Sequence, residues 1–221
     1  MSKEEQRLQE EFAEFKKLTA NPAANETIHP AASVLLLREN AIDGGELELL
    51  LVKRSQNVRF MPGAWVFPGG KLDASDGEPS TEAFQRCGAR ETHEECAVMI
   101  DEPHAMVWFS HWITPQGLPH RFDTRFFLAP APPACQPVAD GHEVDDICWL
   151  TPSAAVECNA SDEMTIFFPT LKQLERLTGI TTITAAFEVA NAAPIEPITP
   201  KAILVDGRPR IVLPGDPGYD D

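Results

Sequence analysis

The sequence lacks the features that would place it in a membrane or in a secreted class. It has no apolar run that approaches the ~18 residues of a membrane-spanning helix. Its N-terminal segment, MSKEEQRLQEEF, contains no apolar core of the kind found in a signal peptide. These absences predict a cytoplasmic protein without a membrane partner.

The sequence also lacks closely paired cysteines and an excess of positive charge. The formal net charge is −16, and a surface of this sign is unsuited to the phosphate backbone of nucleic acids, so we expect no nucleic-acid partner. The cysteines form no CxxC pair, which argues against a zinc site or a disulfide framework. We therefore predict free thiols, most of them buried or half-buried, at Cys87, Cys96, Cys135, Cys148 and Cys158.

The order of the predicted elements indicates an α/β fold with a mixed sheet and helices on its faces. Two apolar runs, 32–40 and 46–55, flank the turn-rich connector AIDGG and predict a β-hairpin. A helix is expected over about 79–96, with Pro79 in its first turn. Further strands are predicted over 104–113, 121–129 and 145–150, and further helices after Thr151-Pro152, over 169–179 and over 181–193.

Two extensions flank the main domain, so we divide the chain into 1–28, 29–193 and 194–221. Apolar residues at helical spacing within 3–18 predict an amphipathic N-terminal helix. This helix either docks on the body of the protein or makes a subunit contact, which leaves a homodimer open. The C-terminal extension is rich in proline, and Asp206-Gly207 between two apolar runs predicts a small hairpin.

An unusual cluster of acids lies in RETHEECAV, residues 90–98. On a helix, Glu91, Glu94 and Glu95 share one face within an arc of roughly 100°. Like charges at these spacings destabilise a helix by a few tenths of a kcal/mol each. The pattern therefore indicates that a cation lies there, and carboxylate oxygens suit Mg²⁺ or Mn²⁺.

Two further features accompany this cluster. Glu82 lies eight residues before Arg90, near the same side of the helix but about 12 Å along its axis. Upstream, the FPGG segment at 67–70 can turn sharply and offer backbone carbonyls or amides to a ligand.

These residues resemble the Nudix box, which reads glycine, five residues, glutamate, seven residues, then Arg-Glu-U-x-Glu-Glu-x-Gly-U, where U is aliphatic. Three departures stand out: eleven residues separate Gly70 from Glu82, Thr92 replaces an aliphatic residue, and Ala97 replaces a glycine. The residues that match at the required mutual spacing are Glu82, Arg90, Glu91, Glu94, Glu95 and Val98.

The resemblance implies a Nudix-type α/β/α sandwich whose loop-helix-loop binds divalent metal beside a diphosphate. It implies metal ligands at Gly70, Glu91, Glu94 and Glu95. It also implies a catalytic group of Arg90, Glu91 and Glu94, in which Arg90 pairs with carboxylates and Glu91 is our choice of general base. Glu82 and Glu143 are candidate additional acids.

The preceding segment, LLVKRSQNVRFMPGAWVFPGG at 50–70, narrows the resemblance. It is similar to an element of the coenzyme A diphosphatase branch with an enlarged Nudix box, Leu-Leu-Thr-x-Arg-Ser/Thr-x3-Arg-x3-Gly-x3-Phe-Pro-Gly-Gly, and departs from it at Val52. Substrate contacts are implied for Arg54, Ser55, Arg59 and Gly69, and guanidinium groups suit phosphates.

The implied reaction is metal-dependent hydrolysis of coenzyme A or acyl-CoA to 3′,5′-ADP and (acyl-)4′-phosphopantetheine. Its partner is thus a small nucleotide substrate. Two alternatives stay open: a pyrophosphatase acting on ADP-ribose or a dinucleotide, and a non-catalytic Nudix domain that senses a ligand.

Overall fold

The computed structural model describes residues 27–40, 45–116, 118, 120–205 and 208–220, so the predicted N-terminal helix lies outside the described residues. Contacts divide the chain into two compact units. One comprises Ala31–Ser110 and Arg125–Ile195 and contains every predicted site residue. Of the residues that the structure describes, the other comprises 27–30 and those within 111–124 and 196–220.

A mixed sheet forms the centre of the first unit, with strand order β3-β2-β1-β6-β5. β4 pairs with β1, and β7 pairs with β2. The predicted hairpin is confirmed, because β1 and β2 run antiparallel with Leu37 opposite Leu49. The strands are β1 (Ile28–Asn40), β2 (Glu46–Arg54), β3 (Trp65–Val66), β4 (Gly69–Lys71), β5 (Val107–Ile113), β6 (Arg121–Pro130) and β7 (Val144–Leu150).

The helices predicted within the described residues are present, with one boundary corrected. α2 begins at Thr81 and is capped by Ser80, whose hydroxyl accepts a hydrogen bond from the Ala83 amide. Pro79 therefore lies before the cap, and our placement of it in the first helical turn was wrong. The helices are α2 (Thr81–Cys96), α3 (Pro152–Ala160), α4 (Phe168–Leu177) and α5 (Ile183–Asn191), with short 3₁₀ turns η1 (Ala74–Asp76) and η2 (Pro103–Ala105).

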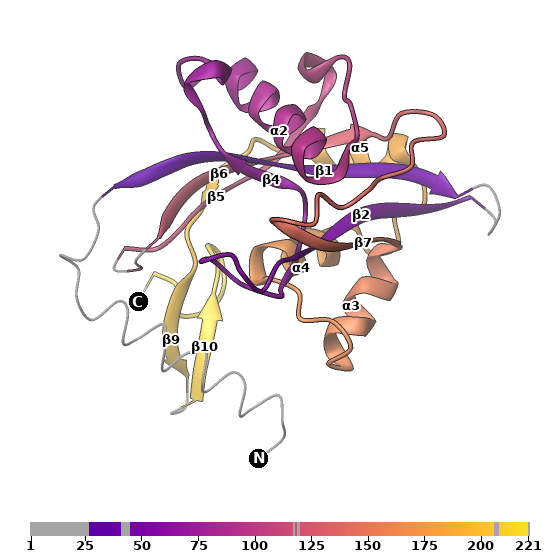
Figure 1. Ribbon diagram of the computed structural model, residues 1–221. Coiled ribbons are helices and arrows are strands. Elements are labelled where there is room, and N and C mark those ends of the chain that lie inside the picture. Colours follow the sequence, from indigo (N-terminus) through magenta and orange to yellow (C-terminus); the bar gives the residue numbers. More distant parts are fainter. Residues whose placement is uncertain (1–26, 41–44, 117, 119, 206–207, 221) are drawn as a thin grey trace. The chain divides into compact units, whose positions relative to one another are not determined.

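The core has two sides because side chains alternate along each strand. Val34 and Leu36 of β1 pack in one cluster with Phe84 and Cys87 of α2. The alternate residues, such as Leu35, are fully buried and point to the opposite face, where Figure 1 shows α3 and α4. The arrangement is an α/β/α sandwich, as expected.

The second unit carries the C-terminal extension. β8 (Pro197–Ile198) pairs in parallel with β5 at His111 and Trp112. The predicted terminal hairpin is confirmed, because β9 (Lys201–Val205) and β10 (Arg208–Val212) run antiparallel with Ile203 opposite Arg210.

Two general expectations can be compared with the fold directly. All five cysteines are free thiols, two of them buried and three half-buried, as predicted. Among the residues that the structure describes, no helix combines the length and apolar character needed to cross a bilayer.

The two substitutions within the Nudix-like helix are both accommodated. Thr92 is completely buried, and its hydroxyl donates to the Gly88 carbonyl one turn earlier, at 2.7 Å. Ala97 ends α2 in the left-handed conformation, with φ 55° and ψ 24°. A non-glycine residue pays roughly 1–2 kcal/mol for this conformation, so the helix end stores strain.

We expect Ala97→Gly to stabilise the protein, because glycine relieves this strain. After the entropy that glycine adds to the unfolded chain, the net gain should be ~0.5–1 kcal/mol. Ala160→Gly, at an exposed position in α3, is the matched control and should destabilise by up to ~1 kcal/mol. Urea unfolding of both variants measures the difference, and equal losses would contradict the strain at Ala97.

Candidate active site

The site is built where β4 meets the second half of α2. The segment before β4 is fastened to β1: the Val34 amide donates to the Pro68 carbonyl at 2.9 Å, and Gly69 pairs with Ser33. A Cβ on Gly69 would lie 2.3 Å from the Ala32 carbonyl oxygen, so only glycine fits this approach. The close pairing brings the backbone of β4 under the acids of α2.

Glu95 is the buried acid of the cluster, with 3% of its surface exposed. Its Oε2 accepts a hydrogen bond from the Gly69 amide at 2.9 Å. Burial raises the pKa of Glu95 to about 8, although the Gly69 amide and the positive charge of Arg54 act in the opposite direction. The Gly69 amide, predicted to contact substrate, is thus bonded to Glu95 here.

Glu91 lies directly against β4. A Cβ on Gly70 would be 2.4 Å from the carboxyl carbon of Glu91, so the glycine makes room for this carboxylate. Burial raises the pKa of Glu91, Arg90 lowers it, and the negative charge of Glu94 raises it again. Burial is the largest of these influences, so the site disfavours the charged form of Glu91 unless a positive charge compensates.

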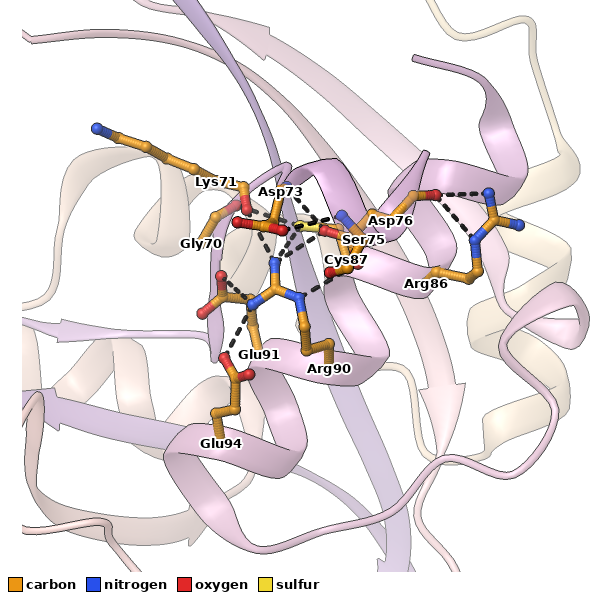
Figure 2. Close-up of polar contacts among 10 residues, drawn as sticks. All are labelled: Gly70, Lys71, Asp73, Ser75, Asp76, Arg86, Cys87, Arg90, Glu91 and Glu94. Atoms are coloured by element: carbon orange, nitrogen blue, oxygen red, sulfur yellow. Dashed lines mark hydrogen bonds and ion pairs between the residues drawn. The ribbon is translucent and has the colours of Figure 1, made fainter. Parts of the chain in front are cut away.

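Arg90 joins two of the predicted acids (Figure 2). Its Nη1 donates to Glu91 Oε1 at 2.9 Å and to Glu94 Oε2 at 2.8 Å. The hydrogen bonds that Arg90 donates to Asp76, followed by the negative charge of Glu91, raise the pKa of Arg90, so the guanidinium remains charged. Glu94 itself is the most open of the three acids, with 56% of its side chain exposed.

Asp76 belongs to the same network and was missed from the sequence. It lies in η1, inside the inserted loop, and is only 3% exposed. Its Oδ1 and Oδ2 accept from Arg90 Nε at 3.2 Å and Nη2 at 2.9 Å. A capping box between Asp73 and Asp76 forms η1, so the spacing Asp-x-x-Asp was the available signal.

The two additional acids have different positions. Glu82 is exposed in the first turn of α2, where its backbone amide and Ser80 lower its pKa. That is the opposite end of α2 from Glu91, Glu94 and Glu95. The negative charge of Glu143, by contrast, helps to raise the pKa of both Glu91 and Glu95, so the structure brings Glu143 to the cluster.

The loop that carries Glu143 is firmly held. The Asp140 carboxylate accepts backbone N–H groups from His142, Glu143 and Val144. The Asp140 amide donates to the Glu95 carbonyl at 3.2 Å, which fixes the loop to the end of α2.

Of the other predicted substrate residues, Arg54 ends β2, and Ser55 and Arg59 lie in the connection from β2 to β3. Arg54 Nε donates to the Phe60 carbonyl at 2.9 Å. The positive charge of Arg54 acts to lower the pKa of Glu95. Ser55 is buried, its amide donates to the Glu143 carbonyl, and its hydroxyl accepts from the Asn57 amide. Arg59 is exposed. Arg54 is therefore the cation of this segment that the structure places near the acids.

The donor chemistry of the cluster fits a hard divalent cation. In the described part of the chain, no three His, Cys, Asp or Glu side chains form a ready-made metal cage. However, the bonds described above use one oxygen each of Glu91, Glu94 and Glu95. A carboxylate has about four acceptor sites, so these groups retain capacity for Mg²⁺ or Mn²⁺. A bound cation would also stabilise the charged forms of Glu91 and Glu95, whose pKa values burial raises.

Curated relatives resemble this chain over most of its length. It is 25% identical over 214 residues to the putative nudix hydrolase 7 of Caenorhabditis elegans, covering 78% of this chain and 70% of the relative. It is 24% identical over 271 residues to the acyl-coenzyme A diphosphatase NUDT19 of Homo sapiens, covering 77% of this chain and 72% of the relative.

Solved structures show the same fold. A NUDIX hydrolase from Alicyclobacillus acidocaldarius superposes with a TM-score of 0.67 at 24% identity, over 76% of this chain and 99% of the other. The NUDIX domain of Shewanella oneidensis NrtR, solved with ADP-ribose, superposes with a TM-score of 0.51 at 20% identity, over 73% of this chain and 94% of the other.

The model of the NUDIX domain family matches residues 27–171, which include the inserted loop, α2 and Arg54. Nudix hydrolases generally use divalent metal ions, in agreement with the acidic cluster. The chain belongs to the Nudix family and is a hydrolase acting on pyrophosphate bonds.

Proposed function

We propose that the protein hydrolyses the diphosphate of coenzyme A or of acyl-CoA, giving 3′,5′-ADP and (acyl-)4′-phosphopantetheine. The observation that carries this proposal is the approach of Arg54, at the end of β2, to the acidic end of α2. Arg54 acts electrostatically on Glu95, although more than thirty residues separate them in the sequence.

The charge distribution supports a substrate with several phosphates. The chain has a net charge of −16, so an anionic substrate needs a local cationic surface. From Leu49 to Leu72 the sequence has four cations and no acid: Lys53, Arg54, Arg59 and Lys71. Coenzyme A carries a 3′-phosphate in addition to its diphosphate, and guanidinium groups bind phosphates through paired hydrogen bonds. The similarity to an acyl-coenzyme A diphosphatase supports the same class of substrate.

The residues of α2 would divide the chemistry among them. Glu91, Glu94, Glu95 and the Gly70 carbonyl would hold Mg²⁺ or Mn²⁺, which supplies positive charge to the diphosphate oxygens when bound. Glu91 would accept a proton from the attacking water, whose oxygen forms a bond to phosphorus while the bridging P–O bond breaks. Arg90 would hold the carboxylates of Glu91 and Glu94 in place, as its two Nη1 hydrogen bonds do here.

Two other functions use the same fold. A pyrophosphatase acting on ADP-ribose or a dinucleotide would need the acidic cluster but no contact to a 3′-phosphate. A ligand-sensing domain would need neither the proton acceptor nor the full set of acids. The complete set of Glu91, Glu94 and Glu95 in this chain therefore favours an enzyme over a sensor.

A panel of diphosphates tests the substrate class. With Mg²⁺, we expect the purified protein to cleave coenzyme A and acetyl-CoA at least ~10-fold faster, in kcat/KM, than dephospho-CoA, because a lost charged contact to the 3′-phosphate costs ~1.5–3 kcal/mol. ADP-ribose and diadenosine diphosphate complete the panel, and chromatography of the products gives the rates. Cleavage of ADP-ribose without cleavage of coenzyme A would refute the substrate assignment.

The role of the acidic face is tested by Glu94→Gln. Glu94 is exposed and its ion pair with Arg90 spans one helical turn, so the fold should lose only ~0.5 kcal/mol. Turnover should fall at least ~100-fold, because a charged group of the site is removed. Glu102→Gln makes the same chemical change at an exposed position outside α2 and should leave turnover unaltered. Equal turnover in both variants would exclude this face as the catalytic centre.

A further inference from the structure

In the Nudix pattern, one acid lies at a fixed distance from both the glycine before it and the arginine after it. That acid follows the glycine by five intervening residues and precedes the arginine by seven. Here the inserted loop makes it impossible for a single acid to satisfy both distances. In this chain five residues, 71–75, lie between Gly70 and Asp76, whereas Glu82 has the seven-residue spacing to Arg90. Two acids therefore compete for one position, and the spatial arrangement distinguishes them.

We propose that Asp76, rather than Glu82, is the first acid of the Nudix box in this chain, and that it positions Glu91 and Glu94 through Arg90. The inference rests on the proposed function of the same site. It makes Asp76 a positioning residue, since its contacts are with Arg90 and not with the acids themselves.

The hydrogen bonds of Arg90 account for its whole guanidinium group. Of its five N–H donors, Nε–H and one on Nη2 bind the Asp76 carboxylate, and the other on Nη2 binds the Lys71 carbonyl at 3.0 Å. Both donors of Nη1 remain for Glu91 and Glu94. Asp76 thus fixes the plane of the guanidinium so that only one nitrogen faces the acidic cluster.

Asp76 is itself held on several sides, as Figure 2 shows. The Asp73 amide donates to its Oδ2 at 2.9 Å. Arg86, one turn before Arg90, donates to the Asp76 carbonyl from Nε at 2.9 Å and from Nη2 at 2.6 Å. Two arginines of α2 therefore bind one aspartate, one through its backbone and one through its side chain.

The charge state of Asp76 agrees with this role. Burial acts to raise its pKa, but the hydrogen bond and charge of Arg90 lower the pKa overall, so the carboxylate is ionised. It balances the charge of Arg90 from the side away from Glu91 and Glu94. Without it, the guanidinium would be drawn towards those two carboxylates and would compete with a bound cation for their oxygens.

The inserted residues follow Asp76 rather than precede it. Gly77 ends η1 with φ 96°, a conformation that favours glycine, and Ser80 then caps α2. The stretch between them lengthens the connection from Asp76 to the helix. Glu82 is carried by this extra length to the exposed first turn of α2, with Arg86 as its cationic neighbour.

Three variants with the same change, carboxylate to amide, separate the two acids. Asp76→Asn places an amide N–H against an N–H donor of Arg90 in either orientation, and we expect kcat to fall ~10–100-fold with KM changed less than ~3-fold. The fold-decrease in kcat caused by Asp76→Asn should be at least ~10 times the decrease caused by Glu82→Gln. Asp73→Asn, three residues from Asp76 in the same turn, should retain kcat because asparagine also caps.

A second measurement does not depend on turnover. In metal-free protein with chelator, Asp76→Asn and Arg90→Gln should each lower the Tm by roughly 5–10 °C, since each leaves a half-buried or buried polar group without its partner. The double variant should lose no more than about the larger single loss, because both changes remove the same contact.

The outcomes distinguish the inference from the proposed function. If the wild type cleaves diphosphates and Glu82→Gln loses as much kcat as Asp76→Asn, or more, the inference is overturned and the function stands. A KM effect in place of a kcat effect at Asp76 would also overturn it. If the wild type cleaves no diphosphate, the proposed function fails, and additive Tm losses would then overturn the pairing, whereas non-additive losses would retain Asp76 as the partner of Arg90.

Discussion

The hydrogen bonds of Arg90 organise the site. One guanidinium binds Asp76 on one side and shares a single nitrogen between Glu91 and Glu94 on the other. Carboxylates at these helical spacings repel one another, and Arg90 offsets part of that repulsion without removing it. Burial still raises the pKa of Glu91, which means that its charged form is disfavoured. Further positive charge at this face would stabilise that charged form. The part of the repulsion that Arg90 leaves is consistent with the cation that we propose at this face.

The sheet brings a backbone without side chains, that of Gly69 and Gly70 in β4, against the acidic face of α2. β4 lies so close to β1 and to α2 that a Cβ at Gly69 would strike the Ala32 carbonyl, and one at Gly70 would strike Glu91. The same closeness lets the Gly69 amide bond to Glu95. Two adjacent glycines therefore allow β4 to lie close to both β1 and the acidic face of α2.

Segments from three parts of the chain complete the site. The inserted loop contributes Asp76, the end of β2 contributes Arg54, and the loop before β7 contributes Glu143. Hydrogen bonds hold these segments in place: Arg86 donates to the Asp76 carbonyl, the Ser55 amide donates to the Glu143 carbonyl, and the Asp140 amide donates to the Glu95 carbonyl. The acidic cluster and Arg54 therefore lie close together, which supports the proposed substrate with several negative charges.

Periodicity and spacing in the sequence were sufficient for the elements and for most of the acidic face. Three features depend on neighbours along the chain: the apolar runs of β1 and β2, the helical spacing of the acids in α2, and the start of α3 after Thr151. For that reason they could be read from it. We misplaced the start of α2 because Pro79 is suited to a first helical turn. Ser80 instead caps the N-terminus of the helix, so α2 begins one residue after it.

What the sequence determined by itself is the family, the sheet with its covering helices, and the presence of three acids on one helical face. Only the tertiary structure decided which acid contacts Arg90, because Asp76 and Glu82 each satisfy one of the two spacings of the pattern. The choice depends on the path of the inserted loop, which η1, Gly77 and Arg86 fix together in three dimensions. Burial of Glu95 and the approach of Arg54 and Glu143 were likewise decided by packing, since residues far apart along the chain create them.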